Sequence, residues 1–415
     1  MSITSSVGRA SSDSAVSYPD LSQPKRAVRQ GRRPRYVFVF IEVLGCEGGI
    51  QSYIKDILTT YASLPSAPPA DVFLLRDRVT PDAIAPFEGG PFRFYGFKSD
   101  RSMWERVRLT LSLGATLWRH RPARVFCGHI NLANMVSQLC SRLRIPYTVL
   151  TYGKEVWESL PTAEQQALAQ ANDIWTISRY SRDLLCAANH IAPAQVKMLP
   201  CVVDGAQFTP ALPSAALKAR YGLDHHQVLM TVARLWKGDP YKGVDVTIRA
   251  LPQIAAQVPD VRYLVIGRGD DQPRLAQLAE ELGVADRVIF AGFVPTAELV
   301  DHYRLADVYV MPSKEGFGIV YLEAMACGVP VIAGDDDGSA DPLQDGRLGW
   351  QVPHRDPAAV TTACLAALAG KDPRCCGDWL REQALSAFGA TALTHQLQDL
   401  LADAGAISSR QHREA

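Results

Sequence analysis

Long apolar runs are missing from this sequence of 415 residues. No uninterrupted stretch approaches the roughly 20 apolar residues that a membrane-spanning helix needs. The N-terminal stretch MSITSSVGRASSDS also lacks the apolar core of a secretory signal. Because 47% of the residues are hydrophobic and 21% are charged, we expect a soluble globular protein of the cytoplasm, long enough for two domains.

Other absences argue against whole classes of protein. The formal net charge is zero, so the composition gives no sign of nucleic-acid binding. Nine cysteines occur without a C-x-x-C pair, which favours reduced thiols packed in the core of a cytosolic protein. No Gly-Lys-Ser/Thr occurs, and GRGDDQPR at 267–274 is not a full Gly-x-Gly-x-x-Gly. P-loop and dinucleotide-binding proteins are therefore disfavoured.

The first 35 residues differ from the rest, because they are rich in Ser and Arg. Basic residues gather toward the end of this segment: Lys25, Arg26, Arg29, Arg32, Arg33 and Arg35. Such a segment cannot bury enough apolar area to fold alone, so we expect residues 1–35 to be a disordered leader. Its basic end suits an anionic membrane surface, and a solvated leader without a partner fits the same composition.

From residue 36 onward, short apolar stretches alternate with helical ones. Expected strands begin at residues 36, 71, 124, 147, 173 and 196, and a second series begins at 227, 261, 287, 306 and 329. Apolar strands that alternate with helices indicate parallel sheets covered on both faces. The predicted fold class is therefore α/β, with two doubly wound domains that face a central cleft.

The stretch 204–226 interrupts this alternation, because it contains two prolines and no strand pattern. We therefore predict an N-terminal domain at 36–205, a linker at 206–225, a C-terminal domain at 226–375, amphipathic C-terminal helices at 376–403 and a tail at 404–415. The C-terminal helix is expected to return to the N-terminal domain.

One charge stands out in the segment EGFGIVYLEAMACGVPVIA, which begins at residue 315. We expect a helix from Ile319 to Cys327 that ends at Gly328. Apolar residues cover almost its whole circumference, which indicates a buried helix. Glu323 is its only charge, and an unpaired buried carboxylate is costly, so a partner must be present.

The start of this helix suits an anion. Gly316 and Gly318 let the backbone approach a ligand closely, and the free N–H groups of the first turn favour a phosphate. Glu315 lies before this site and Glu323 lies inside the helix, so the two carboxylates would bracket a phosphate and accept hydrogen bonds from hydroxyls. A nucleotide sugar has this chemistry. Alternatively, Glu323 pairs with a buried Arg and Glu315 is a loop charge.

A second basic site belongs to the same predicted sheet. Arg234 follows the strand that begins at 227, and Lys242 precedes a helix at Gly243. An Arg fork and a Lys point charge suit a diphosphate, and they neutralise a leaving group as it departs. For Arg234 alone, a surface salt bridge is the alternative.

These segments resemble the nucleotide-sugar-dependent retaining glycosyltransferases of family 4, which have the GT-B fold of two Rossmann-like domains. The resemblance covers the chain beyond residue 36 and is of the bacterial polysaccharide or lipid-linked sugar type. The matching pieces are GGIQSYI at 48, HINLA at 129, TISRYSRDLL at 176, VVDGAQFTP at 202, VARLWKGDPYKG at 232, VIGRGD at 265, DRVIFAGFVP at 286, ADVYVMPSKEGFGIVYLEAMACGVPVIAG at 306 and DGRLGWQVP at 345.

The resemblance implies roles residue by residue. Glu315 and Glu323 match the family's E-x7-E pair, of which the first contacts the donor sugar and the second binds the ribose hydroxyls. The implied catalytic residues are His129, Glu315, Arg234 and Lys242. The implied donor-binding residues are Gly49, Arg234, Lys242, Phe293, Val294, Glu315, Gly316, Phe317, Gly318, Ile319 and Glu323. Catalysis would be retaining, without an enzyme nucleophile, a metal or a cofactor.

Transfer of a hexose from a GDP-mannose or UDP-glucose type of donor is the implied function. The acceptor would be a hydroxyl of a glycan or polyprenyl-linked saccharide, in exopolysaccharide or cell-envelope glycan biosynthesis. The alternatives are an epimerase or another sugar-phosphate enzyme of this fold, and an inactive protein that binds nucleotide sugars. We expect a cytoplasmic location, peripheral on the inner face of the plasma membrane, and no nucleic-acid partner.

Some positions depart from the family or stay open. Cys201 and Val202 stand where Asn-Gly is common, and GDDDGSADPL at 334–343 replaces a donor loop. Asp335–Asp337 resembles a metal-binding run, but a solvated turn is favoured. His129 is either functional or structural, and Glu155 either reaches the cleft or is a surface charge.

The segment RSMWERVRLTLSLGATLWRHRPAR at 101–124 places several arginines beside Trp104, Trp118 and leucines. A basic, Trp-bearing amphipathic helix can lie on an anionic membrane surface. The alternative is a core-packed helix with a solvated basic face.

Overall fold

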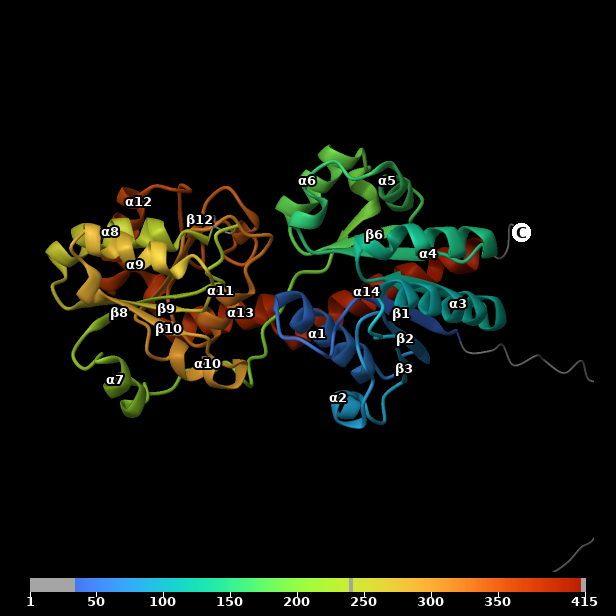
Figure 1. Ribbon diagram of the computed structural model, residues 1–415, viewed down its shortest axis with the longest axis horizontal. Helices are drawn as coiled ribbons and strands as arrows, with labels where there is room; N and C mark the ends of the chain where they lie inside the picture. Colours follow the sequence, from blue (N-terminus) through green and yellow to red (C-terminus); the bar gives the residue numbers. More distant parts are fainter. Residues whose placement is uncertain (1–33, 239–241, 412–415) are drawn as a thin grey trace, which may run out of the picture. The chain divides into compact units, whose positions relative to one another are not determined.

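The computed structural model describes residues 34–238 and 242–411 (Figure 1). The predicted leader lies outside the described residues except for positions 34 and 35, and Arg35 forms a 2.8 Å ion pair with Asp71. The predicted tail is described as far as residue 411, where it continues a helix. Within the described ranges, no helix is both long enough and apolar enough to cross a membrane.

The first sheet has seven parallel strands in the order β3-β2-β1-β4-β5-β6-β7. They are β1 (Tyr36–Phe40), β2 (Ala70–Leu74), β3 (Phe92–Gly96), β4 (Arg124–Cys127), β5 (Tyr147–Thr151), β6 (Asp173–Thr176) and β7 (Val196–Met198). The strand order changes direction between β1 and β4. In sheets of this kind, ligands bind outside the carboxyl ends of the strands at such a point.

The second sheet repeats this plan with six parallel strands in the order β10-β9-β8-β11-β12-β13. They are β8 (Gln227–Val232), β9 (Val261–Ile266), β10 (Val288–Gly292), β11 (Val308–Met311), β12 (Val331–Gly334) and β13 (Trp350–Val352). The order changes direction between β8 and β11. The prediction of two doubly wound parallel sheets is therefore confirmed.

Helices separate the strands of both sheets. In the first half they are α1 (Gly49–Ser63), α2 (Pro81–Ile84), α3 (Ser102–His120), α4 (Ile130–Leu143), α5 (Thr162–Ala169) and α6 (Arg179–Asn189). In the second half they are α7 (Ala215–Tyr221), α8 (Val244–Gln257), α9 (Gln272–Glu281), α10 (Thr296–Tyr303), α11 (Ile319–Ala326), α12 (Pro357–Leu368), α13 (Gly377–Phe388) and α14 (Ala390–Gln411).

The C-terminal helices connect the two halves. Helix α13 packs on α11, and α14 packs on α1. The backbone N–H of Val203 donates to the carbonyl of Phe388 over 2.9 Å. Arg124 of β4 pairs with Asp173 and also donates to the carbonyl of Ala404 over 3.2 Å. The expected return of the C-terminal helix to the N-terminal domain is confirmed.

Three elements were not predicted from the sequence. Strands β3 and β13 lie at sheet edges, and most of their residues are only half-buried, so they lack the continuous apolar runs that marked the other strands. Helix α7 lies within the predicted linker. All nine cysteines are free thiols, and five of them are buried, as expected for thiols that pack in a core.

Candidate functional site

A cavity of about 280 Å³ lies where strands of both sheets end. Its lining includes Tyr152, which follows β5, and Met311, the last residue of β11. Most of the predicted site residues contribute to the lining: Gly49, Lys242, Glu315, Gly316, Phe317, Gly318 and Ile319. The structure therefore brings together residues that are up to 270 positions apart, from Gly49 to Ile319 (319 − 49 = 270).

Two glycines shape the loop between β11 and α11. Gly318 precedes the helix with φ of 91°, and a Cβ there would lie 2.2 Å from the ring of Tyr321. A Cβ on Gly316 would lie 2.9 Å from the carbonyl oxygen of Tyr152. Both positions therefore exclude a side chain because protein atoms approach them closely. The predicted close approach of a ligand remains a prediction.

Glu315 is held on two sides. Its carboxylate forms a 2.5 Å ion pair with the Nζ of Lys242, and both groups are part-buried. Its backbone N–H donates to Asp337 over 2.6 Å. The pair therefore places one cation and one anion at the wall of the cavity.

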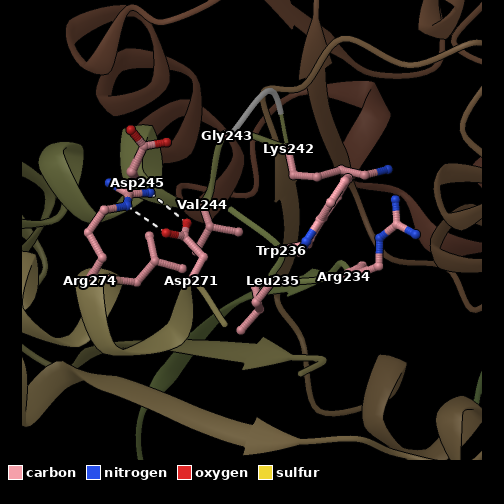
Figure 2. A pocket seen from close by; sticks show the side chains of 10 residues that line it. Arg234, Leu235, Trp236, Lys242, Gly243, Val244, Asp245, Asp271 and Arg274 are labelled. Atoms are coloured by element: carbon pink, nitrogen blue, oxygen red, sulfur yellow. Dashed lines mark hydrogen bonds and ion pairs between the residues drawn. The ribbon is translucent and has the colours of Figure 1, made fainter. Parts of the chain in front are cut away.

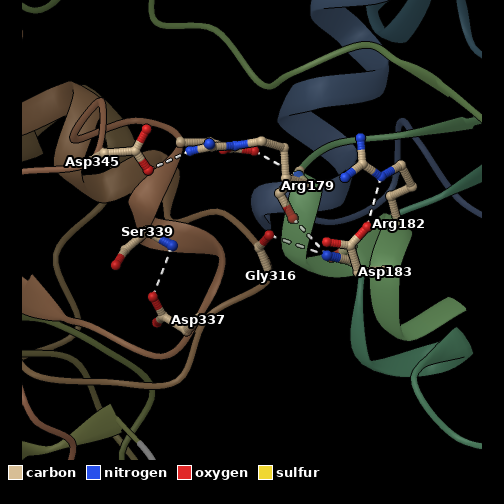
Figure 3. Close-up of polar contacts among 10 residues, drawn as sticks. Arg179, Arg182, Asp183, Gly316, Asp337, Ser339 and Asp345 are labelled. Atoms are coloured by element: carbon tan, nitrogen blue, oxygen red, sulfur yellow. Dashed lines mark hydrogen bonds and ion pairs between the residues drawn. The ribbon is translucent and has the colours of Figure 1, made fainter. Parts of the chain in front are cut away.

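Asp337 is buried and organises the loop that follows β12. It accepts hydrogen bonds from the backbone N–H groups of Glu315 and Ser339, the second over 2.8 Å (Figure 3). Burial raises the pKa of Asp337 to about 6, while these hydrogen bonds lower it. The prediction of a solvated turn is therefore wrong for Asp337, although Asp335 and Asp336 are exposed. Among the described residues, no cluster of His, Cys, Asp or Glu could hold a metal ion.

Arg234 and Lys242 line a neighbouring pocket, where Trp236 lies close to both in Figure 2. The guanidinium of Arg234 lies 5.4 Å from the Trp236 ring, and that ring is half exposed. The Asp271–Arg274 ion pair lies apart from this group, with a separation of 2.6 Å. The two predicted diphosphate ligands are therefore neighbours on the loop that follows β8.

Glu323 lies on α11 and accepts a hydrogen bond from the hydroxyl of Tyr303 over 2.6 Å. Burial raises the pKa of Glu323 to about 7, and the Tyr303 bond lowers it. Burial also raises the pKa of Asp56 to about 7, with the charges of Asp204 and Glu323 adding to the shift. The partner seen for Glu323 is thus a tyrosine hydroxyl, and the alternative of a buried arginine is wrong within the described part of the chain.

His129 caps the N-terminus of α4. Its Nδ1 accepts from the backbone N–H of Asn131 over 3.1 Å, which leaves Nε2 to carry the proton of the neutral ring. Burial lowers the pKa of His129, and the charge of Arg76 lowers it further. His129 does not line the 280 Å³ cavity, but its ring lies 6.4 Å from that of Tyr152, which does. His129 therefore has a structural role as the cap of α4, and its catalytic role stays a prediction.

Phe293 and Val294 also lie outside the lining of the cavity. Phe293 is 55% exposed, and the guanidinium of Arg268 lies 4.8 Å from its ring. Val294 is half-buried against the core. Their implied role in binding the donor stays a prediction.

A second cavity of about 330 Å³ shares Ile50, Tyr152, Glu315 and Gly316 with the first. Glu155 and Trp157 complete its wall. Lys154 and Lys314 also line this second cavity. Glu155 accepts from the backbone N–H of Tyr152 over 2.5 Å, and burial raises its pKa. Of the two alternatives for Glu155, the structure favours the cavity over a surface position.

Polar contacts link α6 to the loops of the second sheet, as Figure 3 shows. Arg179 donates to Asp345 over 2.6 Å, and its backbone N–H donates to Asp341 over 2.6 Å. Its guanidinium also pairs with Asp341. The hydroxyl of Ser181 donates to the carbonyl of Gly316 over 3.4 Å, next to Glu315.

Residues 226–370 match the model of the family described as glycosyl transferases group 1. The chain is also 40% identical over 238 residues to a GDP-mannose-dependent alpha-(1-6)-phosphatidylinositol monomannoside mannosyltransferase of Mycolicibacterium smegmatis. This match covers 54% of the chain and 60% of that protein. A D-inositol 3-phosphate glycosyltransferase of Acidothermus cellulolyticus is 37% identical over 200 residues, with 46% and 43% covered. Over part of its length, the chain is therefore similar to group 1 glycosyltransferases.

The matches therefore span only 60% of the length of the mannosyltransferase and 43% of that of the glycosyltransferase. Solved structures cover more of the chain. HepE of Anabaena in complex with UDP matches with a TM-score of 0.74 at 19% identity, over 89% of this chain and 100% of that one. Sucrose-phosphate synthase of Thermosynechococcus elongatus matches with a TM-score of 0.69 at 20% identity, over 90% and 100%. At these identities the likeness concerns the fold, and it confirms the predicted GT-B arrangement.

Sequence reasoning missed several residues of the site. Tyr303 is the hydroxyl partner of Glu323, Asp337 holds the Glu315 loop, and Trp157 borders the second cavity. Only Asp337 carried a sequence signal, because the stretch GDDDGSADPL was noted as a departure from the family pattern. Tyr303 ends α10 and Glu323 lies on α11, and no sequence motif links a tyrosine to a glutamate at this separation.

Proposed function

We propose that this chain transfers a hexose from a nucleotide-diphosphate sugar to a hydroxyl of a glycan or lipid-linked saccharide. The observation that carries the proposal is the Lys242–Glu315 ion pair, which faces a cavity at the N-terminus of α11. The GDP-mannose-dependent relative of Mycolicibacterium smegmatis favours that donor over UDP-glucose. The exopolysaccharide or cell-envelope pathway is part of the same proposal.

In the proposed complex, the donor diphosphate lies between Lys242, Arg234 and the N–H groups that begin α11. Cations and free helical N–H groups both favour phosphate oxygens. Glu315 leaves Lys242 and accepts hydrogen bonds from the sugar hydroxyls, while Glu323 accepts from the ribose. The free protein keeps Lys242 and Glu315 paired, so neither charge is left unpaired before the donor arrives.

The reaction that we propose proceeds with retention and without a metal. The bond from the anomeric carbon to the phosphate oxygen breaks as the acceptor oxygen bonds on the same face. The leaving phosphate takes the acceptor proton, and Lys242 and Arg234 neutralise the charge that develops on the diphosphate. The chain then needs no nucleophile of its own.

The second cavity is the proposed acceptor side. An indole can pack against the apolar face of a sugar ring, and Trp157 supplies one. The carboxylate of Glu155 supplies a hydrogen-bond acceptor for a hydroxyl. Because both cavities share Glu315 and Gly316, an acceptor held there would meet the donor sugar at that wall.

Incubation of the protein with the donor, with and without a saccharide acceptor, distinguishes the function classes. A transferase releases GDP from GDP-mannose and forms a glycoside only when an acceptor is present. An epimerase converts the donor without an acceptor, and an inactive binder converts nothing. Binding of GDP, UDP and ADP by calorimetry tests the choice of base, and tighter binding of UDP would overturn the GDP assignment.

Lys242→Ala and Arg234→Ala test the diphosphate site. Each removes a charge-assisted contact, so we expect donor affinity to fall roughly 10- to 100-fold. Arg249→Ala, which removes an exposed arginine of α8, is the matched control and should bind like the wild type. Equal affinities for all three variants would show that the diphosphate lies elsewhere.

A further inference from the structure

A groove of about 290 Å³, here called the α4 groove, runs along α4 and shares no residue with the two cavities described above. Helices α3 and α5 both pack against α4, as Figure 1 shows, and each adds to the wall. Most of the lining comes from α4 itself: Asn131, Asn134, Met135, Gln138, Leu139 and Arg142. Because residues three and four apart share one face of a helix, the groove follows α4 over about 17 Å, at roughly 1.5 Å per residue.

Three of the lining side chains are carboxamides, from Asn131, Asn134 and Gln138. Each carboxamide donates and accepts hydrogen bonds. The Nε2 of Gln138 donates to the Oδ1 of Asn134 over 3.0 Å. Within the part of the chain that the structure describes, that bond leaves most of the donors and lone pairs of the three amides open to a ligand with many hydroxyls.

The charges of the α4 groove do not cancel. Arg106 of α3 and Arg142 of α4 supply two guanidinium groups, and Glu164 of α5 supplies one carboxylate, which leaves a net charge of +1 (2 − 1 = 1). Both arginines are exposed, and within residues 34–238 and 242–411 neither forms an ion pair. A guanidinium is a planar fork that binds a carboxylate through two hydrogen bonds. The groove therefore suits a ligand that brings negative charge of its own.

The rest of the lining offers a small aliphatic surface. Met135 and Leu139 line the groove and are half-buried. The hydroxyl of Thr110 donates to the carbonyl of Arg106 over 2.7 Å, so its proton is already used within α3. None of the described residues that line the groove is aromatic, so nucleic-acid bases would find no ring on which to stack. Aliphatic carbon atoms suffice for van der Waals contact with the C–H face of a sugar ring.

A polyhydroxylated ligand with negative charge fits this lining best. A peptide helix would need a groove lined by apolar side chains, which the carboxamides do not provide. The volume of the groove lies at the lower end of the range for small-molecule sites, roughly 300–1,000 Å³, so it takes a short stretch of a chain. We propose that the α4 groove binds an acidic glycan, with carboxylates of the glycan on Arg106 and Arg142 and its hydroxyls on the three carboxamides.

The α4 groove begins next to the proposed acceptor side. Asn131 lines the groove, and its backbone N–H donates to the Nδ1 of His129 over 3.1 Å. The ring of His129 lies 6.4 Å from that of Tyr152, which lines both cavities. A glycan in the groove would therefore have one end near the proposed acceptor cavity. Its use as the remote part of an acceptor rests on the proposed function, whereas the binding site itself does not.

Binding is measured by calorimetry on the full chain, without a nucleotide sugar. The probes are tetragalacturonic acid, its methyl ester, which has the same rings without the charges, and inorganic phosphate. We expect the acid to bind at least about ten-fold more tightly than the ester, because only the acid forms charge-assisted bonds with the arginines. Inorganic phosphate should bind more weakly than the acid, because it lacks the ring hydroxyls.

Three outcomes would overturn the proposal. Equal affinity for acid and ester would remove the role of the arginines, phosphate that binds as tightly as the acid would leave a simple anion site, and no binding of the acid would leave no site. Because no donor is present, a protein that binds the acid but transfers no sugar would refute the proposed function and keep this inference. A transferase that does not bind the acid would do the reverse.

Charge reversal tests whether the acid lies in the groove. Arg106→Glu/Arg142→Glu should weaken the binding of tetragalacturonic acid roughly 100-fold or more, because each arginine contributes a charge-assisted contact. Arg108→Glu/Arg119→Glu is the matched control, since it makes the same change of charge at two exposed arginines of α3 that do not line the groove. If the control loses as much binding, the attraction is general and the groove is not the site.

The contacts with ring hydroxyls are tested at Gln138. Gln138→Leu should weaken the binding of tetragalacturonic acid roughly five- to ten-fold and leave that of phosphate unchanged, because only the sugar has hydroxyls for the amide. Gln277→Leu is the control, since Gln277 is also exposed and also bonds one turn along its helix, to Glu281 over 2.9 Å. An acid that binds Gln138→Leu as tightly as the wild type would be held by its charge alone, which would contradict a glycan site.

Discussion

At the scale of single residues, the buried carboxylate of Glu323 lowers stability, while the proposed function uses it to bind the ribose. It lies on a helix that is otherwise apolar, and its partner within the described ranges is the hydroxyl of Tyr303. Burial raises its pKa to about 7, so the free protein holds it partly protonated near neutral pH. A ribose would add hydroxyl donors and favour the ionised form.

Replacement of this carboxylate by an amide gives the first prediction. Between about pH 4.5 and about pH 7, the folded protein holds a proton on Glu323 that the unfolded chain has released. Raising the pH across this interval therefore lowers the free energy of unfolding. Glu323→Gln removes this titration, so its advantage over the wild type should grow with pH to about 1–3 kcal/mol. Calorimetric unfolding at several pH values measures the difference.

The same variant should bind the donor roughly 10- to 100-fold more weakly, because an amide accepts hydrogen bonds from the ribose less strongly than a carboxylate. Glu298→Gln, at an exposed position of α10, is the control for both measurements. A stability difference that is constant with pH would contradict the account of the titration. Unchanged donor affinity would contradict only the ribose contact.

At the scale of elements, the loop between β11 and α11 depends on Gly318. An alanine there would need φ near 91°, and its Cβ would meet the ring of Tyr321, which is buried and bonded to Ser313 over 2.8 Å. We expect Gly318→Ala to lower the free energy of unfolding by about 2–4 kcal/mol, from backbone strain and overpacking together. Denaturant unfolding measures this loss.

Gly370→Ala is the matched control for that substitution. Gly370 has φ of 67°, but a Cβ there would have no atom within 4 Å. Gly370→Ala therefore measures the cost of backbone strain alone, and we expect it to lower the free energy of unfolding by about 1 kcal/mol. If both variants lose the same free energy, the contact with Tyr321 adds nothing and the loop adapts.

Elements were also the level at which the sequence was most informative. Strands with continuous apolar runs, such as β1 and β8, begin at the predicted residues because burial on both faces leaves an unmistakable pattern. Edge strand β13 has three residues, too few to show any period. Site residues were predictable where a recognisable motif follows the end of a predicted strand, as at Glu315 and Lys242. Contacts between distant segments, such as Tyr303 with Glu323, depend on packing that local patterns do not encode.

At the scale of the whole molecule, polar contacts next to the Glu315 loop link the two halves in addition to the C-terminal helices. Arg179 is about half exposed, so its ion pairs with Asp341 and Asp345 contribute little to stability. Their position matters more, because Ser181 on the same helix contacts Gly316 in the cavity wall. We infer that these contacts hold α6 close to the Glu315 loop.

Arg179→Ala therefore should open the molecule without unfolding it. We expect a larger radius of gyration by small-angle X-ray scattering, a melting temperature close to that of the wild type and a several-fold higher KM for the donor. Arg182→Ala is a nearby control, because Arg182 lies one turn along α6 and forms its 2.8 Å ion pair with its neighbour Asp183. If the two variants scatter alike and share one KM, the Arg179 ion pairs have no part in closure.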